Sequence, residues 1–117
     1  MKYSYSFRYS YYGTLLLDLP KKVELFANFI ELIATEERAN QFIQIIDEVQ
    51  EGKLDEYEIF YNAPTVLIKQ EFTSVSLSYI LDDPPPDQYI ETDEFRELIL
   101  IWKEKLPERF LDKNWQI

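Results

Sequence analysis

The first residues of the chain alternate strictly between aromatic and polar side chains. The aromatic positions are Tyr3, Tyr5, Phe7, Tyr9 and Tyr11, and the polar ones are Lys2, Ser4, Ser6, Arg8 and Ser10. A period of two with bulky side chains on one face predicts a half-buried antiparallel strand. Gly13 interrupts the pattern, so residues 14–19 either continue this strand beyond a bend or form a second one. We expect the aromatic face to pack on a core rather than to stack on nucleic-acid bases, because the opposite face offers only Lys2 and Arg8 as cations.

The apolar spacing then becomes helical. Asp18 and Pro20 suit the start of a helix, and Val23, Phe26, Ile30 and Ile33 follow at helical intervals. Thr35 is a fresh candidate N-cap, and a second apolar stripe follows it at Ala39, Phe42, Ile43, Ile46 and Val49. Gly52 is typical of a helix end, because glycine adopts the left-handed conformation at little cost. The pattern predicts two consecutive helices, or one helix that breaks at Thr35.

Three short strands are predicted next, at residues 57–61, 65–71 and 75–79. Turns are expected at residues 62–64 and near Thr73 and Ser74. The connections are too short for parallel crossovers, so we expect these strands to form an antiparallel meander.

The last part of the chain begins with three prolines in residues 82–87, which predict a stiff, exposed loop. Thr92 or Asp93 is expected to cap a final helix that Pro107 ends. The buried stripe of this helix is expected at Phe95, Leu98, Ile99, Trp102 and Leu106. Apolar side chains in the tail predict that it docks on the domain.

These patterns predict one α+β domain over residues 1–117. Its antiparallel sheet is expected to hold four to five strands packed against two or three helices, in the order β(β)αα-βββ-α. The sheet is expected to begin with the aromatic N-terminal strand.

The composition argues against several kinds of catalytic and binding site. The chain has no histidine and no cysteine, which argues against the common serine and cysteine hydrolases and against thiolate metal sites. With only two glycines, a glycine-rich phosphate loop is excluded. The absence of a secretory signal and of a long apolar run favours a cytoplasmic protein without a membrane span. We therefore expect no enzymatic activity, no cofactor and no metal, and the acidity argues against nucleic acid as a partner.

The excess of negative over positive charge lies in one part of the chain. The net charge is -10, and residues 47–97 hold fourteen acids against three bases. A localised acidic block with interleaved tyrosines predicts a face for a basic protein partner, because carboxylates steer the encounter and tyrosines supply contact area. The partner-binding residues expected on this basis are Asp55, Glu56, Tyr57, Glu58, Tyr61, Asp82, Asp83, Asp87, Tyr89, Glu91, Asp93 and Glu94. The alternative is that these acids only solvate exposed helix faces and turns.

The order of segments from Phe42 onward supports a resemblance. FIQIIDEVQEG ends in a glycine, EYEIFYNAP runs into an asparagine turn, TVLIKQE and SVSLSYIL follow, and TDEFRELILIWKEKL closes the series. This series resembles small bacterial proteins encoded beside polymorphic or contact-dependent-inhibition toxins. In such families the immunity proteins are typically acidic and bind a basic toxin domain, such as a nuclease. The resemblance rests on Gly52, Asn62, Phe95 and Trp102, and it implies no catalytic residues.

Two other functions remain open at this point. A structural or assembly protein could form a homodimer through the apolar tail residues Phe110, Leu111, Trp115 and Ile117. A metal-dependent enzyme could use carboxylates, although Asp82, Asp83 and Asp87 lack the ligand spacing, glycine and closing glutamate of an EF-hand loop.

Overall fold

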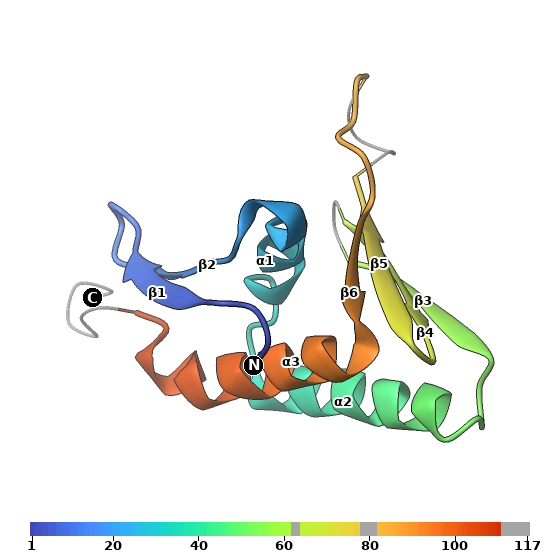
Figure 1. Ribbon diagram of the computed structural model, residues 1–117. Helices are drawn as coiled ribbons and strands as arrows, with labels where there is room; N and C mark the ends of the chain where they lie inside the picture. Colours follow the sequence, from blue (N-terminus) through green and yellow to red (C-terminus); the bar gives the residue numbers. More distant parts are fainter. Residues whose placement is uncertain (62–63, 78–81, 111–117) are drawn as a thin grey trace.

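Helices separate a four-stranded sheet from a two-stranded hairpin (Figure 1). The computed structural model describes residues 1–61, 64–77 and 82–110. The short helix α1 (Leu25–Ile30) lies between the hairpin and the larger sheet, while α2 (Glu36–Gln50) and α3 (Thr92–Lys105) run side by side beneath them. The expected α+β class with an antiparallel sheet is therefore confirmed.

The larger sheet is antiparallel in the order β3-β4-β5-β6. Its strands are β3 (Glu56–Phe60), β4 (Thr65–Lys69), β5 (Phe72–Ser76) and β6 (Gln88–Glu91). The predicted meander is confirmed, but the turn expected near Thr73 and Ser74 is wrong, because Ile68 pairs with Thr73 and Leu67 with Ser74 inside the β4–β5 ladder. The chain reverses instead at Gln70 and Glu71. Asn62, Ala63 and Tyr79, which were assigned to a turn and a strand, lie outside the described residues.

A fourth strand, β6, was not expected in the segment that follows the prolines. Its residues gain their extended conformation from pairing with β5, where Thr73 faces Ile90 and Ser74 faces Tyr89. The inner face of this sheet is apolar and buried, and it consists of Ile59, Val66, Ile68, Val75 and Ile90. These buried residues alternate along each strand with residues on the outer face, as expected for a sheet that packs one face on a core.

The aromatic N-terminal segment does not join this sheet, so the expectation that the sheet begins there is wrong. Strand β1 (Ser6–Tyr9) pairs instead with β2 (Leu15–Asp18) in a hairpin of its own. Residues 14–19 thus supply a second strand rather than a continuation. The main-chain N–H of Leu17 donates to Glu31 at 2.7 Å, and that of Leu15 donates to the carbonyl of Arg109 at 2.8 Å. These bonds hold the hairpin against the turn after α1 and against the end of the chain.

The aromatic face of this hairpin is only partly buried. Phe7 packs against Trp102, with ring centroids 6.2 Å apart, and Tyr9 is half-buried. Tyr11 and Tyr12 lie at the turn and are 96% and 74% exposed. The prediction of a core-facing aromatic strand therefore holds for the middle of the segment and fails at its tip, where no element packs over the turn within the described residues.

Local signals set the ends of α2. Thr35 caps it as expected, because its Oγ1 accepts a hydrogen bond from the main-chain nitrogen of Arg38 at 3.1 Å. Gly52 has φ of 81° and follows the last turn. The nitrogen of Lys53 donates to the carbonyl of Glu48 at 2.9 Å, and that of Gly52 donates to Val49 at 3.1 Å, which is a Schellman motif.

The helix expected from Asp18 to Ala34 is shorter than the spacing predicts. Pro20 precedes a single 3₁₀ turn, η1 (Lys21–Val23), and α1 then covers six residues. Asp18 does not cap this segment, because it lies in β2 and pairs with Arg8 at 2.9 Å.

Neither Thr92 nor Asp93 caps α3 as the sequence predicts. Glu91 precedes the helix, and no side chain caps it. Thr92 instead donates its hydroxyl to the carbonyl of Lys69 at 2.6 Å and lies 2.9 Å from the hydroxyl of Thr73. Thr92 therefore joins the first turn of the helix to the sheet. The expected stripe of Phe95, Leu98, Ile99 and Trp102 is buried, and Leu106 begins the 3₁₀ turn η2 (Leu106–Glu108).

The core lies between the helices and both sheets. Trp102, Phe26, Phe29 and Phe95 are its largest fully buried side chains. The indole nitrogen of Trp102 donates to the carbonyl of Ile33 at 2.8 Å, so its polar group is satisfied inside the core. None of the helices in the described ranges combines the length and the apolar character that a membrane span requires.

Candidate partner-binding surface

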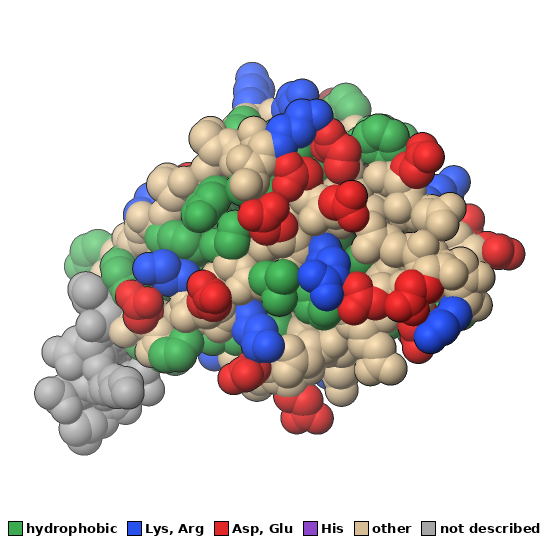
Figure 2. Space-filling model, turned by 60° about the horizontal axis from the view of Figure 1, so that its bottom comes forward, with side chains coloured by type: hydrophobic (Ala, Val, Ile, Leu, Met, Phe, Trp, Pro, Cys, Tyr) green, Lys and Arg blue, Asp and Glu red, His purple; other side chains and the backbone are tan. Residues whose placement is uncertain are grey.

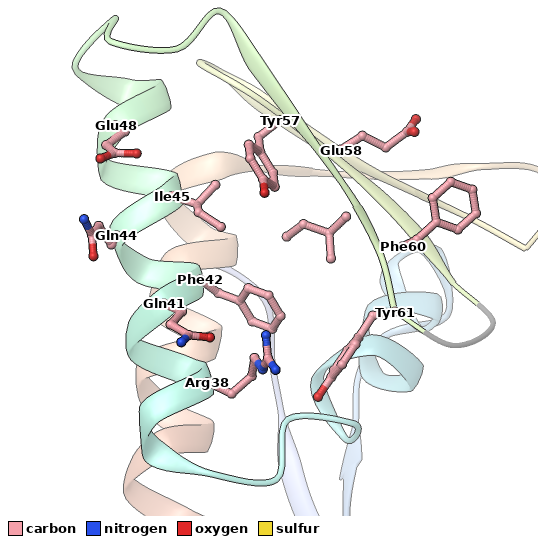
Figure 3. A pocket seen from close by; sticks show the side chains of 11 residues that line it. Arg38, Gln41, Phe42, Gln44, Ile45, Glu48, Tyr57, Glu58, Phe60 and Tyr61 are labelled. Atoms are coloured by element: carbon pink, nitrogen blue, oxygen red, sulfur yellow. The ribbon is translucent and has the colours of Figure 1, made fainter.

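Strand β3 forms one edge of the larger sheet and presents different side chains to its two sides. Glu58 and Phe60 point to the outer face of the sheet, away from the helices (Figure 3), and Glu56 shares their parity. Tyr57 has the opposite parity and points toward α2 (Figure 3), and Ile59 shares its parity and is buried. A single strand therefore supplies carboxylates and an aromatic ring to one surface and aromatic and aliphatic groups to another.

An open groove separates β3 from α2 (Figure 3). Its volume is about 460 Å³. The strand contributes Tyr57, Glu58, Ile59 and Phe60, and the segment beyond it contributes Tyr61. The helix contributes Arg38, Gln41, Phe42, Gln44, Ile45 and Glu48. The lining is thus aromatic and aliphatic toward the core and polar along the exposed side of α2.

The floor of the groove is held by aromatic contacts. The ring of Tyr61 lies 5.7 Å from that of Phe29 and 5.6 Å from that of Phe42, both edge-to-face. Its hydroxyl donates to the carbonyl of Leu32 at 3.1 Å. The guanidinium of Arg38 lies 5.9 Å from the centre of the same ring. Tyr61 is therefore fixed between the core and solvent.

The outer face of the sheet carries large exposed side chains. Phe60, Phe72 and Tyr89 are 58%, 52% and 61% exposed. The ladder pairs Glu58 with Leu67, Leu67 with Ser74 and Ser74 with Tyr89, so these four side chains form one row across the sheet. Two of the expected partner-binding residues, Glu58 and Tyr89, therefore share a face although β3 and β6 are opposite edges of the sheet.

Acids at the junction of α2 and α3 have partners within the chain. Asp47 binds Arg96 at 2.7 Å, and the side-chain amide of Gln50 donates to Asp93 at 2.5 Å. On the view that brings these helices forward, basic side chains lie among the acidic ones (Figure 2). Asp47 is thus neutralised by Arg96, whereas Asp93 is hydrogen-bonded within the chain but keeps its charge.

Glu91 is also engaged. It accepts hydrogen bonds from the ammonium of Lys2 and, at 2.6 Å, from the hydroxyl of Tyr3. These bonds lower the pKa of Glu91 to about 2, with Lys2 as the larger cause. The carboxylate of Glu94 accepts from the main-chain nitrogen of Lys2 at 2.5 Å. The N-terminal residues thus bind the acids around the start of α3.

The proline loop lies elsewhere. Asp82, Asp83 and Asp87 are exposed. The segment 82–87 that holds them stands at the end of the sheet opposite to the last turn of α2 (Figure 1). The acidic block is therefore continuous in sequence but divided in space. One group runs from Asp55 to Tyr61, along β3 and its approaches. The second group is Glu91, Asp93 and Glu94, whose carboxylates all accept hydrogen bonds from other parts of the chain.

The partner-binding residues expected from the sequence do not include Phe60, although it is one of the aromatic residues within the acidic block, nor Phe72 or the polar side chains of α2 along the groove. The parity of Phe60 relative to Glu58 could have indicated a shared outer face, but Phe72 needs the register of β4 and β5, which is not a local property. In the part of the chain that the structure describes, no group of three or more acids is arranged to hold a metal ion.

The fold and this surface define a small α+β protein with an aromatic and acidic face at one sheet edge. Comparison with curated proteins finds a relative from Bacillus cereus named "Immunity protein". It is 30% identical over 118 aligned positions, which cover 100% of this chain and 99% of the relative. The chain belongs to the family of this immunity protein, and the resemblance noted from the sequence is confirmed. No family model matches the sequence, and no solved structure matches it.

Proposed function

We propose that this protein is an immunity protein that binds a toxin domain and inhibits it without catalysis. The observation that carries the proposal is the full-length relationship to the Bacillus cereus immunity protein. The exposed aromatic and acidic groups around β3 support it, because large rings and carboxylates together suit a protein interface.

The mechanism that we propose is occlusion of a basic domain, such as a nuclease. Glu56 and Glu58 would attract the partner, and Phe60 and Tyr89 would anchor it on the outer face of the sheet. Electrostatic attraction would act mainly on the association rate, whereas the buried rings would slow dissociation. The binding needs no cofactor, no nucleic acid and no membrane.

We expect a toxin to be encoded beside this gene, and protection from that toxin is the direct test. Expression of that toxin domain alone in a bacterial host is expected to stop growth, and co-expression of this protein is expected to restore it. Growth arrest that persists although both proteins are present would contradict the proposal.

The role of the β3 acids is testable by charge reversal. The double variant Glu56→Lys and Glu58→Lys is expected to lower the association rate with the toxin domain by about tenfold or more at low salt. The matched control is Asp82→Lys with Asp83→Lys, which changes the net charge equally at the far end of the sheet. We expect a smaller loss for the control, and the rate of the unaltered protein is expected to fall as salt increases. Equal losses in both variants would contradict the assignment to β3.

A further inference from the structure

The two edges of the larger sheet are not equivalent. The β6 edge is flanked by other parts of the chain, because the side chain of Gln88 accepts from the nitrogen of Leu25 at 2.8 Å and donates to the carbonyl of Lys21 at 3.1 Å. At the other end of β6, Tyr3 binds Glu91. Strand β3 is bordered instead by the open groove toward α2.

The main chain of β3 is oriented to accept another strand. The nitrogen of Tyr61 donates to the carbonyl of Pro64 at 3.2 Å, so Tyr61 bonds toward β4. Bonded and non-bonded residues alternate in an antiparallel ladder, so the main-chain groups of Tyr57 and Ile59 also point toward β4. Those of Glu56 and Glu58 consequently point away from β4, toward the open edge.

The side chains around this edge define what could pair there. Residues of an added strand that face Glu56 and Glu58 would lie on the outer face, where a cation is favoured. The alternate residues would lie over the groove, against Tyr57 and Ile45 of α2. The edge thus fits an extended segment in which basic and apolar side chains alternate.

We propose that an extended basic segment of the partner pairs with β3 in antiparallel fashion, as a fifth strand of the sheet. This inference rests on the proposed function and names the contact through which it operates. The antiparallel direction follows the other pairs of this sheet, and antiparallel pairing is the slightly more stable kind.

A second copy of this chain could also pair with β3, but the negative charge of the strand disfavours that pairing. In a two-fold antiparallel pair centred on β3, Glu58 would face Glu58 of the other copy. Like charges directly opposite each other in a ladder are destabilising. Charged side chains on an edge strand are also a common protection against self-association.

The test uses a capped heptapeptide in which lysine and valine alternate. In an antiparallel pair, the lysines that face Glu56 and Glu58 direct their main-chain N–H groups at β3, and the valines direct theirs to solvent. One peptide is N-methylated at its two interior lysines, and its isomer at two valines. The charge and composition of the two peptides are identical.

Titration of the full chain, followed by calorimetry or NMR, is expected to show that the valine-methylated peptide binds at least about tenfold more tightly than its isomer. Equal affinities, no binding of either, or the reverse order would overturn antiparallel pairing at β3.

A protein variant provides an independent readout. Glu58→Pro removes the outward N–H without breaking the ladder to β4, and Glu58→Gln removes only the charge. With folding verified by circular dichroism, the unmethylated peptide is expected to bind the proline variant about tenfold or more weakly than the glutamine variant. Equal binding to both would overturn the proposal.

These outcomes separate the two levels of inference. If the protein protects cells from the neighbouring toxin but does not discriminate between the methylated isomers, strand pairing is wrong and the immunity function stands. If it fails to protect, the proposed function is wrong whatever the peptides show.

Discussion

Glu91 links the ionisation of one carboxylate to the stability of the fold. Its pKa is lowered to about 2 from an ordinary value of 4.5, mainly by the bond from Lys2. The folded protein therefore releases this proton more readily than the unfolded chain. The resulting stabilisation is complete above about pH 4.5 and is lost as the pH falls toward 2.

The variant Glu91→Gln is expected to lower the melting temperature at pH 7 and to weaken its pH dependence in the acidic range. The effect is expected to be modest, because Lys2 is exposed and solvent screens the pair. Melting curves between pH 2 and pH 7 measure both quantities. Glu104→Gln, at an exposed position of α3, is the control and should leave the curve nearly unchanged. If the melting temperature of Glu91→Gln depended on acidic pH as strongly as that of the unaltered protein, the linkage would be contradicted.

Trp102 offers a second residue-scale test. Its side chain is 1% exposed and donates to the carbonyl of Ile33. Trp102→Phe leaves that carbonyl without its donor and removes buried volume, so we expect a loss of about 2–4 kcal/mol in the free energy of unfolding. Urea titration measures this loss, and Phe72→Leu on the exposed outer face should cost far less. A loss below that of the control would contradict the assigned role.

Single residues were predictable where the determinant is local. Thr35 and Gly52 act on neighbours within one helical turn, and both expectations hold. Thr92 was misassigned because its hydroxyl partners, Lys69 and Thr73, are distant in sequence. Cap propensity alone does not reveal such competition from tertiary contacts.

At the scale of elements, the Schellman turn at Gly52 sets the path from α2 into β3. A residue with a Cβ is disfavoured at φ of 81°, although nothing lies within 4 Å of a Cβ built there. The cost is therefore conformational rather than steric. Gly52→Ala is expected to destabilise the protein by about 1–2 kcal/mol, as measured by chemical denaturation.

Gly52→Asn is the informative comparison, because asparagine tolerates the left-handed region better than alanine does. We expect it to recover part of the stability. Equal losses in the two variants would indicate that the turn does not depend on the conformation of this residue.

Most elements followed from periodicity, and the exceptions share one cause. Strand β6 contains only Gln88–Glu91 between the prolines and a helix, too few residues for a period to show. The N-terminal strand was recognised, but its partner was not, because pairing depends on which surface remains open. Here Leu15 and Leu17 are buried, so the hairpin covers its own part of the core.

At the scale of the whole molecule, one core connects the two sheets. Trp102 on α3 contacts Phe7 of the hairpin, and Phe95 on the same helix contacts Phe29 of α1. We therefore predict one cooperative unfolding transition, consistent with the expected single domain.

The measurement is urea unfolding of a Trp115→Phe variant, followed by Trp102 fluorescence and by far-ultraviolet circular dichroism. The two curves are expected to coincide. Separate midpoints would indicate that the hairpin and the larger sheet unfold independently, and the one-domain prediction would then be wrong.

The candidate surface shows which of its residues can be grouped from the charge pattern of the sequence and which cannot. Asp55, Glu56, Tyr57 and Glu58 lie in one continuous segment, although Tyr57 points to the opposite side of the strand from Glu56 and Glu58. The charge pattern also grouped them with the acids of segment 82–87, which lies at the opposite end of the sheet (Figure 1). Strand register decides this separation, and register depends on distant partners.

The aromatic floor beneath the groove has a consequence for recognition. Tyr61 is held by two rings and by the carbonyl of Leu32 before any partner arrives. Binding then loses little side-chain entropy at this point, which favours affinity through preorganisation. The groove should keep the same shape in the free and bound protein, so any adaptation on association falls to the partner.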